Sequence, residues 1–399
     1  MSSMDFLEKL LDGVAVEWRP LGDIAKYSDV RIDSSRVRKD NYVGVDNLLQ
    51  NRAGKTDSSY VPNVGRLIEY LPGDILIGNI RPYLKKIWLA NQTGGTNGDV
   101  LVIRPTHPSL SSSYLHQVLT DEQFFAYNMQ HAKGAKMPRG DKLKILEYRI
   151  PIPCPENPKK SLEIQAEIVR ILDAFTSLTA ELTAELTAEL NTRKRQYNHY
   201  RDQLLSFEEG TAEWTPLGDL AENLDNKRKP ITSGLREPGD IPYYGASGIV
   251  DYVKDYIFDE DLLLVSEDGA NLLARNTPIA FSISGKSWVN NHAHVLKFET
   301  YAERRYVEYY LNSIDLTPYI SGAAQPKLNK KNLEDISIPN PSLEEKKRIV
   351  AILDKFDALT NSLSEGLPRE IALRQKQYEH YRDMLLSFPK PEAPTPTAA

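Results

Sequence analysis

Short segments rich in arginine, lysine and amide side chains are the parts of this sequence whose chemistry is most informative. Arginine and lysine can bind phosphate oxygens and guanine edges, and asparagine and glutamine can bind adenine edges. In the first half of the chain the candidates for such contacts are Arg31, Arg36, Arg38, Asn79, Arg81, Lys85, Lys133, Lys136 and Arg139. In the second half they are Lys227, Arg228, Ser247, Asn271, Gln325, Lys327 and Lys330. A solvated surface charge is the commoner role of any one such side chain, so the segments carry weight only as a set.

No catalytic or cofactor-binding motif accompanies these segments. The run at residues 53–56, Ala-Gly-Lys-Thr, lacks the first glycine of a phosphate-binding loop, and no GxGxxG follows an expected strand. An Asp/Asn-Pro-Pro-aromatic run, which would hold a target amine for methylation, is absent from the sequence. His292 and His294 flank Ala293 without a third ligand in register, which favours a strand edge with one exposed histidine over a metal site. We therefore predict no catalytic residue and no metal site.

Composition favours a large globular protein in a reducing compartment. The 399 residues are 41% hydrophobic, which is enough for two or three domains with cores. No apolar run approaches the roughly 20 residues of a membrane span, and the N-terminal residues lack the layout of a secretion signal. Cys154 is the only cysteine, so we expect no disulfide and a cytoplasmic location. The net charge is −6, so nucleic-acid binding would depend on local basic segments or on a partner.

The sequence is a tandem duplication. Glu-Trp-Arg-Pro-Leu-Gly-Asp-Ile-Ala at residues 17–25 returns almost unchanged at residues 213–221. Two further segments, residues 168–175 and 196–207, return at residues 349–356 and 377–388. In each copy an opening motif is followed by a variable block, a proline-rich hinge and a long helical segment. The variable blocks, residues 28–150 and 224–337, differ from each other in sequence.

Short apolar runs punctuated by glycine, proline and asparagine predict strands in both variable blocks, and residues 112–130 and 302–313 predict helices. The expected fold class is therefore mixed α/β. The first long helix is expected at about residues 161–207, and we expect each long helix to start at a serine N-cap, Ser161 or Ser342. Glu345 would complete a capping box with Ser342.

The first long helix contains three identical tetrapeptides, Thr-Ala-Glu-Leu, at residues 179–190. Their leucines, Leu182, Leu186 and Leu190, match Leu363, Leu367 and Ile371 at a shift of 181 residues. Two helical segments of equal length with apolar stripes predict an antiparallel pair, with these leucines facing the partner helix. The repeated tyrosine pairs, Tyr197/Tyr200 and Tyr378/Tyr381, lie three residues apart on one helix face and are expected to be packing residues rather than platforms on which bases stack. Gly366 and Pro368 predict a kink or break in the second helix.

The two long helical segments carry a family resemblance. Each follows Ile-Pro-x-Pro and Ser-Leu-Glu, continues through Ile-Val-x-Ile-Leu-Asp-x-Phe and closes with Tyr-x-His-Tyr-Arg-Asp-x-Leu-Leu-Ser-Phe. The whole chain resembles the DNA specificity subunit of type I restriction–modification enzymes, and the Thr-Ala-Glu-Leu repeat is similar to that of the IC subgroup. The resemblance implies four parts: a first target recognition domain (residues 1–155), a central long helix (156–210), a second recognition domain (211–341) and a distal long helix (342–389). The proline-rich composition of the last residues, 390–399, predicts a disordered tail.

The family implies that each recognition domain reads one half of a split, asymmetric site on double-stranded DNA. The helices would form an antiparallel coiled coil that sets the spacer and docks two modification subunits, which methylate adenine N6. S-adenosylmethionine would be bound by those subunits, and ATP and Mg²⁺ by the restriction subunits, so this chain itself would hold no cofactor. One tetrapeptide would then act as a unit of length, and deleting residues 183–186 should shorten the permitted spacer. A scaffold that organises partner proteins without reading DNA is the alternative, and a stand-alone nuclease or methyltransferase is opposed by the missing motifs.

Overall fold

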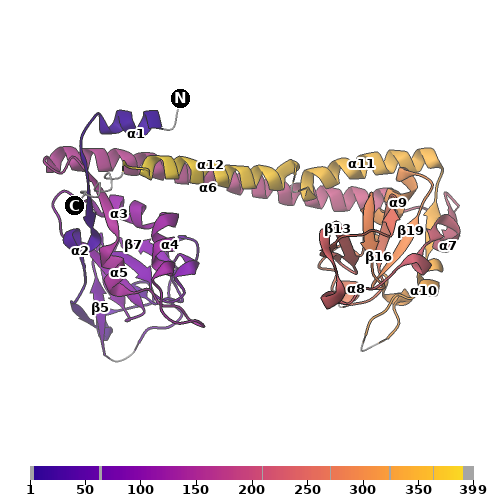
Figure 1. Ribbon diagram of the computed structural model, residues 1–399, viewed down its shortest axis with the longest axis horizontal. Helices are drawn as coiled ribbons and strands as arrows, with labels where there is room; N and C mark the ends of the chain where they lie inside the picture. The colour runs from indigo at the N-terminus through magenta and orange to yellow at the C-terminus, as the bar shows by residue number, and fades with distance from the viewer. Residues whose placement is uncertain are drawn as a thin grey trace, which may run out of the picture. The chain divides into compact units, whose positions relative to one another are not determined.

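The computed structural model describes residues 4–62, 65–208, 210–269, 271–322, 325–362 and 364–389. The chain folds into two compact units, Met1–Thr183 with Ala372–Ala399, and Ala184–Ile371. Each unit combines one variable block with part of each long helical segment (Figure 1). The tail that we expected to be disordered, residues 390–399, lies outside the described residues.

In the first unit, the opening motif and the proline-rich hinge pair with each other. Strand β1 (Val16–Pro20) runs antiparallel to β10 (Arg149–Pro153), with Trp18 opposite Pro151. Each strand has an unpaired side, so the prolines cost no hydrogen bond of the ladder. Between β1 and β10 the variable block forms two four-stranded sheets, in the orders β2-β9-β6-β7 and β3-β5-β8-β4. Their strands are β2 (Ala25–Tyr27), β3 (Arg31–Asp33), β4 (Tyr42–Val43), β5 (Arg66–Tyr70), β6 (Ile75–Gly78), β7 (Ile87–Leu89), β8 (Gly94–Thr96) and β9 (Val100–Pro105).

Helices cover the first of these sheets, and the long helical patch expected at residues 112–130 is in fact two helices. The chain breaks at Asp121, whose side chain accepts a hydrogen bond from the Gln123 amide (2.7 Å) and caps the second helix. The helices of this unit outside the long segments are α1 (Met4–Leu11), α2 (Leu21–Ile24), η1 (Ser34–Arg36), η2 (Pro82–Leu84), α3 (Ser112–Leu119), α4 (Glu122–Gln130) and α5 (Lys142–Glu147).

The second unit repeats this plan although its variable block has a different sequence. Strand β11 (Glu213–Pro216) pairs with β20 (Ser337–Asn340), and the sheets have the orders β12-β19-β16-β17 and β14-β13-β18-β15. The other strands are β12 (Glu222–Asn223), β13 (Pro238–Gly245), β14 (Gly248–Val253), β15 (Phe258–Asp259), β16 (Leu262–Ser266), β17 (Ala280–Ile283), β18 (Lys286–Val289) and β19 (Ala293–Lys297). The helices are α7 (Leu217–Leu220), η3 (Asp225–Lys227), η4 (Ser233–Leu235), α8 (Asn271–Ala274), α9 (Tyr301–Ser313), η5 (Thr317–Tyr319) and α10 (Lys330–Glu334). The expected mixed α/β class is therefore confirmed in both units.

The cores of the two units share the same construction, a pair of buried central strands and a buried tyrosine. Residues of β6 and β9 in the first unit, and of β16 and β19 in the second, are almost fully buried. Helices cover one face of their sheet, and residues of the second sheet pack on the other. A buried tyrosine then fixes a helix to the hinge: the Tyr114 hydroxyl donates to the Pro151 carbonyl (2.8 Å), and the Tyr306 hydroxyl donates to the Pro339 carbonyl (2.9 Å). Each fully buried aliphatic or aromatic side chain contributes about 1.5–3 kcal/mol.

The first long helix, α6 (Pro158–Leu205), is continuous over 48 residues. It starts three residues before the expected N-cap, so the assignment of Ser161 as the cap is wrong. Asn157 caps the helix instead, because its Oδ1 accepts a hydrogen bond from the Lys160 amide (3.1 Å). Ser161 is buried inside the first turn, where its hydroxyl donates to the Ser109 carbonyl (3.3 Å). None of the described helices is long and apolar enough to cross a membrane.

The predicted packing of the repeated aromatic residues is confirmed within each unit. In the first unit Phe175 of α6 stacks on Tyr381 of α12 (Gly366–Leu386), with ring centroids 5.3 Å apart. In the second unit Tyr200 of α6 stacks on Phe356 of α11 (Leu343–Asn361) at 5.7 Å. These are the same pair of positions, because a shift of 181 residues carries Phe175 to Phe356 and Tyr200 to Tyr381. The two copies therefore contribute matching helix contacts to both units.

The second helical segment is interrupted where the sequence predicted a break. Helix α11 ends at Asn361 and α12 begins at Gly366, which has a φ of +78°. A side chain at Gly366 would place its Cβ only 2.4 Å from the Ala358 carbonyl oxygen. Both the positive φ and this close approach therefore require glycine at the position. The N-cap at Ser342 is confirmed by its hydrogen bond from the Glu345 amide (3.3 Å), while the Glu345 carboxylate pairs with Arg348.

The leucines of the tetrapeptide repeat form a half-buried stripe. Leu182, Leu186 and Leu190 are each intermediate in exposure, whereas Leu178, one step earlier, is 52% exposed. The stripe thus begins with the repeat. Leu363, the expected counterpart of Leu182, lies outside the described residues.

Candidate nucleic-acid interface

Both units present a loop of the same construction next to the end of a central strand. In the first unit we call residues 133–139 the first bridged loop, because Lys133 and Arg139 exchange two backbone hydrogen bonds (2.8 and 2.9 Å). The Arg81 amide also donates to the Pro138 carbonyl (2.7 Å), which ties the loop to the segment after β6. Gly134 has a φ of +96° and permits the tight turn.

The second bridged loop, residues 321–327, is built in the same way. Ser321 and Lys327 exchange two backbone hydrogen bonds (both 2.8 Å), and Gly322 has a φ of +85°. The structure describes this loop except for residues 323 and 324. Both loops read Gly-Ala-x-x-Pro followed by a basic residue, so Arg139 and Lys327 occupy equivalent positions.

Each loop is anchored by a backbone hydrogen bond between the residue that follows it and the residue that follows a central strand. The position of this anchoring residue is the same in both units, but its side chain differs. The amide of Gly140 donates to the Asn79 carbonyl (3.1 Å), and the amide of Leu328 donates to the Glu267 carbonyl (2.8 Å). Asn79 and Glu267 each follow a central strand, β6 or β16. One backbone framework thus carries two different sets of polar side chains, an amide in the first unit and a carboxylate in the second.

Most of the candidates for DNA contact are exposed side chains. In the first bridged loop, Lys133 is paired with Asp141 (2.7 Å) and Arg139 with Asp99 (2.7 Å), and both pairs are open to solvent. Pairs of this kind are worth little and exchange readily for another anion. The exposed candidates are Arg31, Arg36, Arg38, Arg81, Lys133, Lys136, Arg139, Lys227, Ser247, Gln325, Lys327 and Lys330.

Four candidates lie deeper, where they support loops. Asn79 is 5% exposed and lies beneath Gly140, at which a Cβ would come within 2.7 Å of its Oδ1. The Asn271 amide closes a loop through two hydrogen bonds with the backbone of Thr277 (both 3.1 Å). Lys85 is half-buried and pairs with Glu122 (2.7 Å). Arg228, the fourth, belongs to a buried network of charges.

That network holds the second bridged loop. The Arg228 guanidinium pairs with Glu267 (2.5 Å) and Asp225 (3.3 Å), and Lys327 of the loop donates to the other oxygen of Glu267 (2.9 Å). Burial disfavours ionisation of Glu267, but the hydrogen bonds from Arg228 and Lys327 outweigh it and hold the pKa of this carboxyl below its usual value. The same carboxylate raises the pKa of Lys327. The basic residue of the loop is therefore held charged and in place.

His294 completes the network from strand β19. Its Nδ1 lies 2.6 Å from Asp225 Oδ2, and its Nε2 lies 2.7 Å from the Leu328 carbonyl oxygen. Burial opposes ionisation of Asp225, yet the hydrogen bond and charge of His294 leave the pKa of that carboxyl lowered. One exposed histidine was expected at this strand edge. His292 is that residue, since its side chain is half-exposed, whereas His294 is fully buried.

The ligand atoms of Asp225, Glu267 and His294 lie within 4.8 Å of one another, a spacing that could hold a metal ion. A guanidinium already bridges the two carboxylates, however, and Lys327 neutralises one of them. We therefore interpret the group as an ion-pair network that positions the loop. Sequence reasoning missed it because Asp225 and Glu267 are distant from His294 along the chain.

A polar cavity adjoins the first bridged loop. It has a volume of about 790 Å³, and Arg81 and Met137 line it together with amide and carboxylate side chains such as Asn47, Asn97 and Asp99. These groups offer both donors and acceptors, as the edges of bases require.

The duplicated chain thus carries a bridged loop of the same backbone construction in each of its two units. The family of type I restriction–modification DNA specificity domains matches residues 14–192 and 211–373. The chain belongs to this family, and its role is that of a specificity subunit, which is non-catalytic.

Known relatives are similar in sequence to this chain over nearly its whole length. It is 37% identical to the specificity subunit of the type I restriction enzyme EcoR124I/EcoR124II of Escherichia coli, over 98% of this chain and 99% of the relative. It is 32% identical to the EcoprrI specificity subunit of Escherichia coli, over 92% and 93%. A chain in a structure of the assembling type I R–M system has the same fold, with a TM-score of 0.64 at 17% identity over 93% of this chain and 97% of that one.

Proposed function

We propose that this specificity subunit reads a split, asymmetric DNA site, with one half-site bound by each unit through its bridged loop and the neighbouring basic side chains. The observation that carries the proposal is the equivalence of the two loops. Their backbone hydrogen bonds match, while the anchoring side chains, Asn79 and Glu267, differ. A shared frame with different side chains is what two different half-sites require.

The exposed basic and amide side chains would make the contacts, and the deeper ones would hold the loops. Arg139 and Lys327 stand at the same position of the two loops, where Arg139 pairs with the partly exposed Asp99 and Lys327 with the buried Glu267. Phosphate or guanine oxygens could replace Asp99 beside Arg139 and could bind the exposed side of the Lys327 ammonium. Asn79, Arg228 and Asn271 would act as positioning residues.

The partners in this proposal are double-stranded DNA, two modification subunits and the restriction subunits of a cytoplasmic type I complex. The modification subunits would carry S-adenosylmethionine, and the restriction subunits ATP and Mg²⁺. The net charge of −6 supports such an arrangement, because a chain of this charge needs help from a partner to neutralise DNA. The triple tetrapeptide supports assignment to the IC subgroup.

Exchange of the bridged loops tests the proposal. Replacing residues 133–139 by the sequence of residues 321–327 should change the preferred bases of one half-site and leave the other unchanged, in a selection from random-sequence DNA with the modification subunits present. Loss of preference at both half-sites would contradict the assignment of one half-site to each unit.

A further inference from the structure

The bridged loops are not the only equivalent parts of the two units. The anchoring residue of each loop, Asn79 or Glu267, also donates its backbone amide to the carbonyl of the residue just before β9 or β19. The acceptor is Asp99 in the first unit (2.8 Å) and His292 in the second (2.9 Å). Asp99 and His292 therefore occupy the same position of the two units, directly beside the anchoring residue.

The turn that leads into β9 or β19 also has the same construction in both units. The side-chain Oδ1 of Asn97 accepts a hydrogen bond from the Asp99 amide (3.1 Å), and that of Asn290 accepts one from the His292 amide (2.8 Å). The strands before these turns, β8 and β18, each run parallel to a neighbour, β4 or β13. A shared asparagine thus fixes the turn, and the residue two positions later differs between the units.

Both of these differing side chains are open to solvent and held by a partner. The Asp99 side chain is 37% exposed, and its Oδ1 accepts a hydrogen bond from Arg139 (2.7 Å). The His292 side chain is 51% exposed, and its Nδ1 lies 2.8 Å from Asp268 Oδ2. Because a carboxylate oxygen accepts, Nδ1 is the donor of this bond. Asp99 Oδ2 and His292 Nε2 have no hydrogen-bond partner among the described residues.

Each side chain lies beside the bridged loop of its unit. Asp99 lines the polar cavity that adjoins the first bridged loop, and it contacts Arg139 of that loop. His292 is tied to the second bridged loop through Asp268, which forms a β-bridge with Lys327. Both side chains are therefore next to the basic residue of their loop, where the proposed half-site would bind.

The chemistry of the two side chains differs as two different half-sites require. A carboxylate can accept a hydrogen bond from the amino group of cytosine but cannot donate one to guanine. The ring nitrogen that His292 presents accepts when the imidazole is neutral and donates when it is protonated, so it is not restricted to amino groups. One position thus carries two side chains that favour different bases.

We propose that Asp99 and His292 each contact a base of their half-site and are specificity-determining residues at one shared position. This inference rests on the proposed function, in which each unit reads its own half-site. It adds an acidic residue to the contacts of the first unit and an imidazole to those of the second. When Arg139 exchanges Asp99 for the DNA, the whole carboxylate is free to accept from a cytosine amino group.

Exchange of the two side chains tests the proposal. Asp99→His and His292→Asp are each titrated, with the modification subunits present, against DNA in which one base of a half-site is varied at a time. Asp99→His should change relative affinities at one position of the first half-site by roughly ten-fold and leave the second half-site unchanged. His292→Asp should do the reverse and favour cytosine at one position of the second half-site. Each variant is therefore the control for the other.

A double variant separates a base contact from support of Arg139. In a chain that already carries Arg139→Ala, Asp99→Ala should still relax the preference at its own base position by roughly ten-fold. A carboxylate that only positions Arg139 would have no further effect in this chain. That result would overturn the proposal for Asp99.

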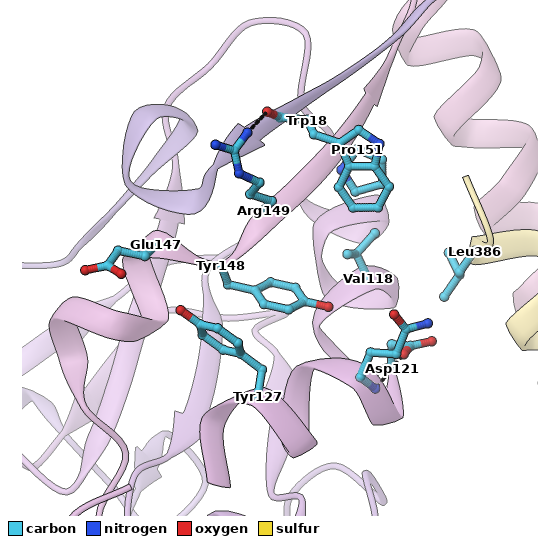
Figure 2. Close-up of a pocket in the computed structure, with 10 residues that line it drawn as sticks. Trp18, Val118, Asp121, Tyr127, Glu147, Tyr148, Arg149, Pro151 and Leu386 are labelled. Atoms are coloured by element: carbon cyan, nitrogen blue, oxygen red, sulfur yellow. Dashed lines mark hydrogen bonds between the residues drawn. The ribbon is translucent and has the colours of Figure 1, made fainter. Parts of the chain in front are cut away.

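Glu147→Gln is the matched control for loss of a surface carboxylate. Glu147 is an exposed residue of the first unit that pairs with a cation, Lys144 (2.7 Å), as Asp99 does with Arg139. Figure 2 shows it near Tyr127 at an aromatic groove, and this groove and the polar cavity share no lining residue among those described. The variant should leave every base preference unchanged.

Two kinds of failure can be told apart. If the Asp99 and His292 variants weaken binding equally on all DNA sequences, these side chains read no base, and the proposal is overturned while each unit keeps its half-site. Loss of preference at both half-sites after the exchange of the bridged loops would instead contradict the proposed function on which the inference rests.

Discussion

Deleting one tetrapeptide, residues 183–186, should shorten the DNA spacer and leave both half-sites unchanged. Helix α6 is continuous over 48 residues, about 72 Å at ~1.5 Å per residue. Four residues correspond to about 6 Å of rise and to roughly 40° of rotation beyond a full turn. One base pair of B-DNA advances about 3.4 Å and 34–36°. The rotation therefore corresponds to one base pair and the rise to nearly two, so the preferred spacer should be one or two base pairs shorter.

Two features of the structure make this deletion tolerable. The leucines of the stripe are four residues apart, so Leu182 and Leu190 take up the same spacing once Leu186 is removed. The other helical segment is interrupted between Asn361 and Gly366, which is the region equivalent to residues 181–184 of the repeat. A joint at this position can absorb the change in length without straining a continuous partner helix.

The assay is competitive binding of the chain with its modification subunits to DNA in which both half-sites are fixed and only the spacer length varies. A control variant with four alanines at residues 183–186 keeps the length of α6 and should keep the original spacer. An unchanged spacer preference in the deletion variant would refute the idea that α6 measures length. Altered bases in either half-site would refute the separation of length from sequence.

Three further predictions concern single residues. Arg139→Ala and Lys327→Ala should each weaken binding by about 1–3 kcal/mol, each relaxing base preference at a different half-site, as measured by titration of half-site variants. Gly366→Ala should lower the free energy of unfolding in urea by roughly 1–3 kcal/mol, because alanine is strained at a φ of +78° and its Cβ would approach the Ala358 carbonyl. His116→Gln should flatten the dependence of stability on pH between about 4 and 6.5. Burial, followed by the charge of Arg382, lowers the pKa of His116 to about 4, so the unfolded chain binds its proton first and stability falls as pH drops through this window, by about 3 kcal/mol in all.

Each of these changes has a control. Lys376→Ala removes a basic residue of α12 that is not a candidate for DNA contact, and should leave both half-sites unaffected. Gly210 also has a positive φ, of +85°, but a Cβ there would meet nothing within 4 Å, so Gly210→Ala should cost less than Gly366→Ala. A pH profile in His116→Gln as steep as in the unaltered chain would contradict the role given to this histidine.

The long-range organisation of the fold could be predicted because it repeats in the sequence. The duplicated segments predicted that the repeated tyrosines pack, and the glycine–proline pair predicted the break before α12; the phenylalanine partners of Tyr200 and Tyr381 emerge only in the structure. The residue that caps a helix could not be predicted in the same way, because two neighbouring residues can both serve as the cap. Ser161 and Asn157 are both good N-caps, and only the burial of Ser161 against Ser109 decides between them.

The sequence pointed to the loops of the candidate site, but not to the contacts that hold those loops in place. The Gly-Ala-x-x-Pro-basic pattern occurs in both variable blocks and could have identified the bridged loops as equivalent, but the surrounding sequences differ and obscured it. The depth of Asn79 and Arg228 could not be predicted, because it depends on partners far away in the chain, such as Gly140 and Glu267.

If the two equivalent loops read two different half-sites, a footprint of the chain bound to its modification subunits, on DNA selected from random sequences, should reveal both. Two short blocks of fixed bases are expected, which differ from each other and are separated by a spacer of constant length. A single continuous block, two identical half-sites, or binding without base preference would contradict it.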